Sequence, residues 1–265
     1  MPVPRVVRRR LSVLLAVLVG AAGVGALVAP SAAAAHTATF SVDRAIPGFV
    51  YDVAVGSGGT VWAVTSDGAF QASGSQVGVR QIPIFAQRVA VDPDGLPWFV
   101  DFAGRIWQGH ADGTSTQMPG AARDIAIGPD GIPWIIGTNF RNSSFQVWHW
   151  TGVEWTPDAG SGQEIDVDAN SEPVVNGADD KIWVRNGGPD QGWSRITGKA
   201  LDMGALNSVN GNGLWIVGTD HRVWNLTNGV WDRSDTPSTT QIAVTPGGVP
   251  WTVDAAGELN IGSVR

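Results

Sequence analysis

The sequence predicts an all-β protein, specifically a six-bladed β-propeller with four-stranded blades. Three observations predict it: a recurring tryptophan, a shared pattern around each copy, and an N-terminal strand in register with the last repeat. Trp62, Trp98 and Trp134 lie 36 residues apart, and 12 of the 13 tryptophans fall into three such series, with Trp150 left over. Self-similarity over 35 to 41 residues is typical of stacked or radially arranged repeats.

Each repeat has the pattern of four short strands. It begins with alternating apolar and polar residues, as in DVAVGSGGTVWAV from Asp52, and this alternation is typical of a half-buried strand. A turn such as Pro93-Asp94-Gly95 leads into an apolar strand with the tryptophan, and two shorter strands follow. Prolines in the repeats argue against paired helices. The six copies begin at Asp52, Arg88, Asp124, Glu164, Ala205 and Gln241, the fourth has Val174 in place of tryptophan, and Leu206–Asn210 interrupts the fifth.

The two ends of the repeat array are expected to meet. The sixth repeat contains three strands, and residues 37–42 have the pattern of the fourth. Pro47, Pro83 and Pro119 lie 36 residues apart, which places the N-terminal strand in the same register. We therefore expect this strand to pair with the last blade and close the ring, which removes an open sheet edge. Closure and buried tryptophans would compensate for the absence of cysteine in an exported domain.

The N-terminal residues predict export. Residues 1–35 combine a basic start, an apolar stretch over 11–28 and an alanine-rich end, as in a secretory signal peptide. An uncleaved signal anchor is the alternative, because the apolar stretch approaches spanning length. Export by the general or the twin-arginine route stays open. The prediction is a secreted protein of residues 36–265, and the alanine- and glycine-rich composition suggests a bacterial source.

Charge limits the partners. The leader holds four of the 17 basic residues and none of the 24 acidic ones, so residues 36–265 have 13 basic against 24 acidic residues, a net charge of −11. Nucleic acids and anionic membranes would repel such a surface, so we expect neither as a partner and no membrane insertion after cleavage. We expect a monomer.

The repeats resemble those of the tectonin family, the tectonin- and tachylectin-like lectins. The segment Asp124-Ile-Ala-Ile-Gly-Pro-Asp-Gly-Ile-Pro-Trp134, followed by Val147-Trp-His-Trp-Thr-Gly152 and Trp155, is the copy most similar to the family pattern. The resemblance extends over all six repeats and implies a propeller that binds glycans on cell surfaces or cell walls. The family also includes protein-interaction modules.

Candidate ligand-binding residues combine an indole with a polar residue after the tryptophan strand, because sugars favour an apolar plane beside short polar groups. The alternative is that the indoles are core residues and the polar residues turn formers. The candidates are Asp101, Asn139, Arg141, Asn176, Asp220 and Asp254, with Trp98, Trp134, Trp150 and Trp251. The insertion 138–145, with Phe140 and Asn142, is the loop that turn chemistry explains least.

Other chemistry has little support in the sequence. The segment Asp166–Glu172 spaces oxygen ligands as calcium loops do, but it lacks the central glycine, and Asp168 corresponds to the turn residue Asp92 of another repeat. The histidines lie in separate repeats, so no zinc site, other metal or cofactor is expected. No catalytic motif is present, and the prediction is that the protein is not an enzyme. The predicted function is glycan binding at repeated sites between blades. A protein-interaction scaffold is the first alternative, and a propeller lyase or glycosidase is the second, less favoured one.

Overall fold

The computed structural model describes residues 39–42, 46–73, 76–187, 192–205, 213–234, 236 and 238–263. Within these residues the chain is all-β, without a helix, and its sheets are antiparallel. Consequently, none of the described residues forms a helix that could cross a membrane. The predicted signal peptide at 1–35 and the interruption at Leu206–Asn210 lie outside the described residues.

The strands form two sheets of four and two sheets of seven. The first contains β2 (Val50–Val55), β3 (Val61–Thr65), β4 (Gly68–Ser73) and β5 (Gln76–Ile82). The second contains β6 (Ala86–Val91), β7 (Pro97–Asp101), β8 (Arg105–Gly109), β9 (Ser115–Ile127), β10 (Pro133–Arg141), β11 (Ser144–Trp150) and β12 (Trp155–Gly162). The third contains β13 (Ile165–Val167), β14 (Pro173–Asn176), β15 (Lys181–Arg185), β16 (Trp193–Ala205), β17 (Leu214–Gly218), β18 (Val223–Thr227) and β19 (Val230–Arg233). The fourth contains β20 (Thr239–Val244), β21 (Pro250–Asp254), β22 (Leu259–Ser263) and β1 (Thr39–Val42).

The uneven sheet sizes have a local cause. β9 and β16 are 13 residues long, and each pairs through its N-terminal half with the strand before it and through its C-terminal half with the strand after it. A strand that continues without a break joins what the sequence predicts as two separate sheets. The strands are therefore divided into two sheets of four and two sheets of seven, rather than into the six equal sheets that the sequence predicts.

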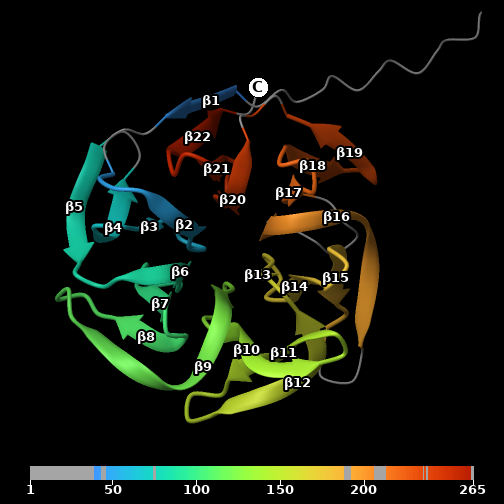
Figure 1. Ribbon diagram of the computed structural model, residues 1–265, viewed down its shortest axis with the longest axis horizontal. Coiled ribbons are helices and arrows are strands. Elements are labelled where there is room, and N and C mark those ends of the chain that lie inside the picture. Colours follow the sequence, from blue (N-terminus) through green and yellow to red (C-terminus); the bar gives the residue numbers. More distant parts are fainter. Residues whose placement is uncertain are drawn as a thin grey trace, which may run out of the picture. The chain divides into compact units, whose positions relative to one another are not determined.

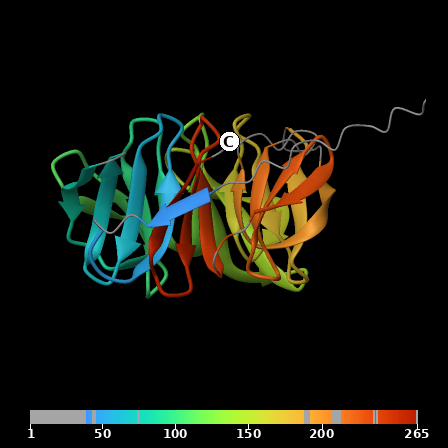
Figure 2. The ribbon, with the colours of Figure 1, turned by 90° about the horizontal axis from the view of Figure 1, so that it is seen from above.

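Six strand segments surround the centre of residues 39–263. They are β2, β6, the C-terminal half of β9, β13, the C-terminal half of β16, and β20, called here the inner strands. Each contacts the next, and β20 contacts β2, so the cycle is closed. Figure 1 shows the sheets radiating outward from this centre, and Figure 2 shows them standing side by side.

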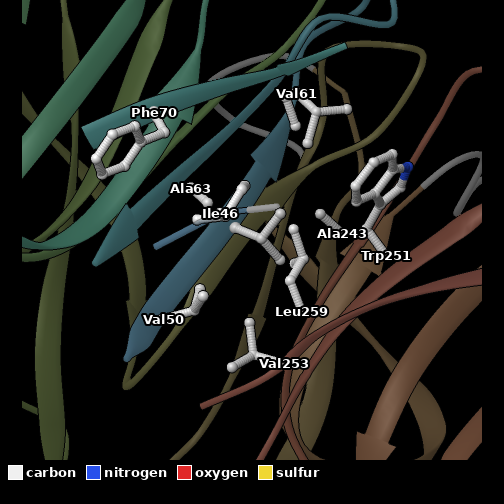
Figure 3. Close-up of a cluster of buried hydrophobic side chains, with 11 residues drawn as sticks. Ile46, Val50, Val61, Ala63, Phe70, Ala243, Trp251, Val253 and Leu259 are labelled. Carbon is white, nitrogen blue, oxygen red and sulfur yellow. The ribbon is translucent and has the colours of Figure 1, made fainter. Parts of the chain in front are cut away.

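The first and last sheets are joined by a core cluster. β1 pairs antiparallel with β22, from Thr39 opposite Ser263 to Val42 opposite Asn260, as the sequence predicts. Figure 3 shows apolar side chains that gather between the two sheets. Val50, Val61, Ala63 and Phe70 come from the first sheet, Ile46 from the segment before it, and Ala243, Trp251, Val253 and Leu259 from the last. This packing joins the two ends of the array.

The tryptophans of the first series are core residues. Trp62 is fully buried, packs against β6 and donates its indole N–H to the carbonyl of Gly95, at 3.1 Å. In the fourth repeat Val174 occupies this position, and its cross-strand partner Asp166 stands where Ala54 pairs with Trp62 in the first repeat.

The register of the fifth repeat corrects the sequence alignment. Gly204 pairs with Trp215, as Ala54 pairs with Trp62. Asp202 therefore occupies the position of Asp52, and the inner strand of this repeat ends at Ala205 rather than beginning there. The alignment failed because residues 206–212 enlarge the interval between the strand and its tryptophan.

Candidate functional site

The inner strands enclose a central pocket of about 310 Å³. Its exposed lining residues, Ser57, Pro129, Ala169 and Pro246, lie in turns that follow inner strands. At the other end of these strands the lining includes Gln241 and several acidic side chains, among them the buried Asp52 and Asp124. The pocket therefore opens at the turns and has a floor of carboxyl groups.

The floor carboxylates connect neighbouring inner strands. Asp52 accepts a hydrogen bond from the backbone N–H of Val89 at 2.9 Å, and Asp124 accepts one from Ile165 at 2.6 Å. Asp202 accepts one from Ile242 at 2.5 Å, and Asp166 bonds the N–H of Ala205. The inner strands are edge strands, so the N–H groups on their free side have no neighbouring strand to bond. These carboxylates accept hydrogen bonds from such N–H groups.

One cation lies beside this floor. The Arg88 guanidinium lies 3.3 Å from an Asp124 oxygen and 3.2 Å from Glu164. Burial alone would lower the Arg88 pKa, but Glu164, Asp124 and Asp52 raise it overall, so the guanidinium stays charged. Burial raises the pKa of Asp52 to about 7 against the lowering effect of Arg88, and burial raises that of Asp166 to about 7 as well. These carboxyls can exchange a proton near neutral pH.

A second cavity, the lateral cleft, has a volume of about 510 Å³ and lies between the third and fourth repeats. Its lining comes from the β10–β11 turn, β12, the β14–β15 turn, Trp183 of β15 and Trp193 of β16. The Trp193 N–H donates to Asp158 at 3.1 Å. A Cβ on Gly160 would lie 2.3 Å from the Trp193 ring, so only glycine allows this indole its place.

Polar groups around the lateral cleft have unused hydrogen-bonding capacity. The side chains of Asn142, Ser143 and Ser161 and the indole N–H of Trp183 make no hydrogen bond to any described residue. Asn142 and Ser143 form a tight turn with φ of 49° and 65°. The Lys181 ammonium holds the pKa of Asp179 below its usual range through a hydrogen bond. The cleft thus combines two half-buried indoles with free donors and acceptors.

In two other repeats the equivalent indole N–H is occupied by an aspartate of the preceding turn. The Trp224 N–H donates to Asp220 at 3.1 Å, and the Trp107 N–H donates to Asp101 at 3.1 Å. In the fourth repeat Asp179 pairs with Lys181 instead, and no such bond to Trp183 forms. The fourth repeat therefore leaves the Trp183 indole N–H without the aspartate partner that Trp107 and Trp224 have.

Several predicted binding residues have internal partners. Asp101 is buried and accepts four hydrogen bonds, two of them from the backbone N–H groups of Ala103 and Arg105. Asn176 is buried and bonds Glu164 and Ala200. Asp254 accepts bonds from two backbone N–H groups in its own turn, and Asp220 is exposed with one oxygen engaged. Their role in ligand binding stays a prediction.

The other predicted residues differ in exposure. Trp98, Trp134 and Trp251 are buried. Trp150 is half-buried, with its ring 5.2 Å from that of Trp155. Asn139 and Arg141 are exposed, and Arg141 bonds Gln146. The insertion was the one signal that led toward the cleft, through Asn142. Trp183 and Trp193 were hidden among equivalent tryptophans that have structural roles.

The candidate calcium loop is a turn. Asp168 accepts hydrogen bonds from the N–H groups of Asn170 and Glu172, and Asp92 accepts the equivalent bond from Leu96. Across the described part of the chain, no three His, Asp or Glu side chains are grouped to hold a metal ion.

The chain matches no protein-family model and no curated protein. It is similar to solved structures, among them a protein of unknown function from Bacteroides thetaiotaomicron, with 14% identity, a TM-score of 0.60, and coverage of 86% of this chain and 72% of that one. A gluconolactonase from Xanthomonas campestris gives 10% identity, a TM-score of 0.66, and coverage of 88% and 92%. The structure of YCF48 bound to D1 peptide gives 11% identity, a TM-score of 0.56, and coverage of 88% of this chain and 97% of that one. The chain therefore belongs to the class of all-β proteins with a propeller-like fold.

One of these structures corrects a prediction. The sequence led us to expect that the protein is not an enzyme, because no familiar catalytic motif is present. A gluconolactonase has the same fold at only 10% identity. Missing motifs are therefore no ground for excluding catalysis in this fold.

Proposed function

We propose that the protein is a carbohydrate-binding β-propeller of the tectonin type and that the lateral cleft is its principal sugar site. The carrying observation is the pairing of two half-buried indoles with unpartnered polar groups of Asn142, Ser143 and Ser161. A sugar presents apolar ring faces and hydroxyls, and such a cleft complements both. The ligand class is a glycan of a cell surface or cell wall.

The wider proposal covers architecture and location. If the two halves of β9 and of β16 are assigned to different blades, the strand pairings support six blades of four strands. We propose a secreted monomer that binds neither nucleic acid nor membranes, in agreement with the excess of acidic residues.

A glycan array with bacterial cell-wall and O-methylated sugars tests the proposal. Trp183→Ala should weaken binding of an array-positive glycan by about tenfold, a loss of about 1.4 kcal/mol, because an aromatic anchor is removed. Trp224→Ala is the matched control, since Asp220 occupies its indole N–H. Equal loss in both variants, or none in Trp183→Ala, would contradict the site. A blank array with folded protein would favour a protein-interaction scaffold, a function compatible with the peptide bound by YCF48.

Catalysis in the central pocket is a second candidate. Asp52 and Asp166 have pKa values raised to about 7 by burial, and such carboxyls can donate or accept a proton near neutral pH. The gluconolactonase fold likeness suggests the first substrate to test. Hydrolysis of gluconolactone that Asp166→Asn abolishes would support this candidate, and no turnover above the uncatalysed rate would count against it.

A further inference from the structure

Exposed phenylalanines gather at the rim where the inner strands begin. Phe49 directly precedes β2, Phe85 directly precedes β6, and Phe102 directly follows β7. Their exposed fractions are 46%, 64% and 58%. Since β6 and β7 are antiparallel, the start of one and the end of the other lie at the same rim. The first-series tryptophans, in contrast, are buried.

Phe49, Tyr51 and Phe102 form a continuous surface. Together with Phe85 on the strand next to Phe102, they are called here the aromatic arc. The Tyr51 ring lies 5.4 Å from Phe49 and 5.2 Å from Phe102, edge-on to the latter. Ala86 pairs with Asp101, so Phe85 and Phe102 occupy the next positions outward on neighbouring strands. A contiguous exposed aromatic surface is typical of an interaction site.

Two exposed carboxylates flank the arc. The Ser66 hydroxyl accepts the N–H of Phe49 at 3.1 Å and donates to Asp67 at 3.2 Å. On the other side, Gly257 packs against the Phe49 ring and accepts the N–H of Val50 at 3.0 Å, which places its neighbour Glu258 beside the arc. Neither Asp67 nor Glu258 forms an ion pair with a described residue.

The nearby arginines are already compensated. Arg105, beside Phe102 in the same turn, bonds the Asp101 carboxylate at 2.6 Å. Arg88, two residues beyond Ala86, lies against Asp124 and Glu164. Among the side chains that the structure describes, the free charge around the arc is therefore negative, in keeping with the net charge of −7 of the whole chain.

We propose that the aromatic arc docks a basic segment of a protein partner. Ring faces attract ammonium and guanidinium groups, and the carboxylates of Asp67 and Glu258, whose neighbours Ser66 and Gly257 contact Phe49, can pair with a Lys or Arg side chain stacked on this ring. The partner is thus an exposed peptide segment that carries Arg or Lys. This surface is separate from the lateral cleft and does not depend on sugar binding.

Titration with a fluorescent 12-residue peptide of alternating Gly and Arg tests the proposal, with a Gly–Glu peptide as its charge-reversed counterpart. Tyr51 is the only tyrosine of the chain, so selective labelling gives one ring signal that reports the arc by NMR. We expect the Gly–Arg peptide to shift this signal and the Gly–Glu peptide to leave it unchanged. Raised salt should weaken the binding.

Variants locate the binding. Phe49→Ser with Phe102→Ser should raise Kd at least tenfold, whereas Phe140→Ser, at a residue 72% exposed outside the arc, should leave it unchanged. Asp67→Asn with Glu258→Gln alters no core packing and should raise Kd at least threefold, which keeps the test valid if the phenylalanine variant fails to fold. No binding, a stationary Tyr51 signal, or unchanged affinity in the carboxylate variant would overturn the proposal. Glycan binding should be the same in the phenylalanine variant of the arc and in the carboxylate variant.

Discussion

The central pocket and the lateral cleft use polar side chains in opposite ways. In the central pocket, Asp52, Asp124 and Asp166 each bond the backbone of the next inner strand. In the lateral cleft, Asn142, Ser143 and the Trp183 N–H have no partner among the described residues. Polar residues that hold the fold are already occupied, and those available to a ligand are the ones the fold leaves free. Hydrogen-bond satisfaction thus separates the cavities better than residue type does.

The largest expected difference is in the free energy of unfolding of two variants, each of which truncates one carboxyl in one of the cavities. Asp124→Ala should lower the free energy of unfolding by about 2–5 kcal/mol, because it removes the acceptor for the Ile165 N–H and a partner of Arg88. Asp179→Ala at the lateral cleft should change it by no more than about 0.5 kcal/mol, since this group is exposed. Urea unfolding measures both, and similar losses would refute the contrast.

A smaller effect is expected from pH. The folded-state pKa of Asp52 and Asp166 is about 7, above the ordinary 3.8, so the folded protein binds more protons between these values. Their contribution to stability is complete below about pH 4 and is lost as pH rises through about 7. We expect each of the two carboxyls to contribute a decline of about 2–3 kcal/mol from pH 5 to pH 8, measured by thermal and urea unfolding. Asp166→Asn, which resembles the protonated acid, should flatten this profile; an unchanged slope would speak against a raised Asp166 pKa.

The smallest effect concerns the wall of the cleft. Gly160→Ala should destabilise the protein by about 1–3 kcal/mol, because the added Cβ would lie 2.3 Å from the Trp193 ring and displace it. Gly177→Ala meets its nearest side-chain atom at 3.3 Å, the flexible Asp179 carboxylate, and should be nearly neutral. Melting temperature and sugar affinity should fall together in Gly160→Ala alone. Unaltered affinity in a folded Gly160→Ala would remove Trp193 from the site.

The sequence predicted the β class and the joining of the two ends, because tryptophan spacing and strand alternation are local patterns repeated many times. It could not predict the carboxylate bonds of the pocket floor. Asp52 and Val89 are 37 residues apart, and an aspartate within an alternating strand resembles any other polar residue of that pattern. The lateral cleft was equally hidden. Trp183 and Trp224 are equivalent in sequence. They differ because Asp179 pairs with Lys181, whereas Asp220 accepts the N–H of Trp224.

The pairing of β1 with β22 also has a meaning for the order of events during synthesis. A strand made early belongs to the same sheet as one made more than 200 residues later. As the chain leaves the ribosome from its N-terminus, β1 has no sheet to join until β22 emerges. Intermediate repeats can pair locally in the meantime. Completion of the ring is then the last step of folding, and the interval before it is when the edges of β1 and β22 are open to other chains.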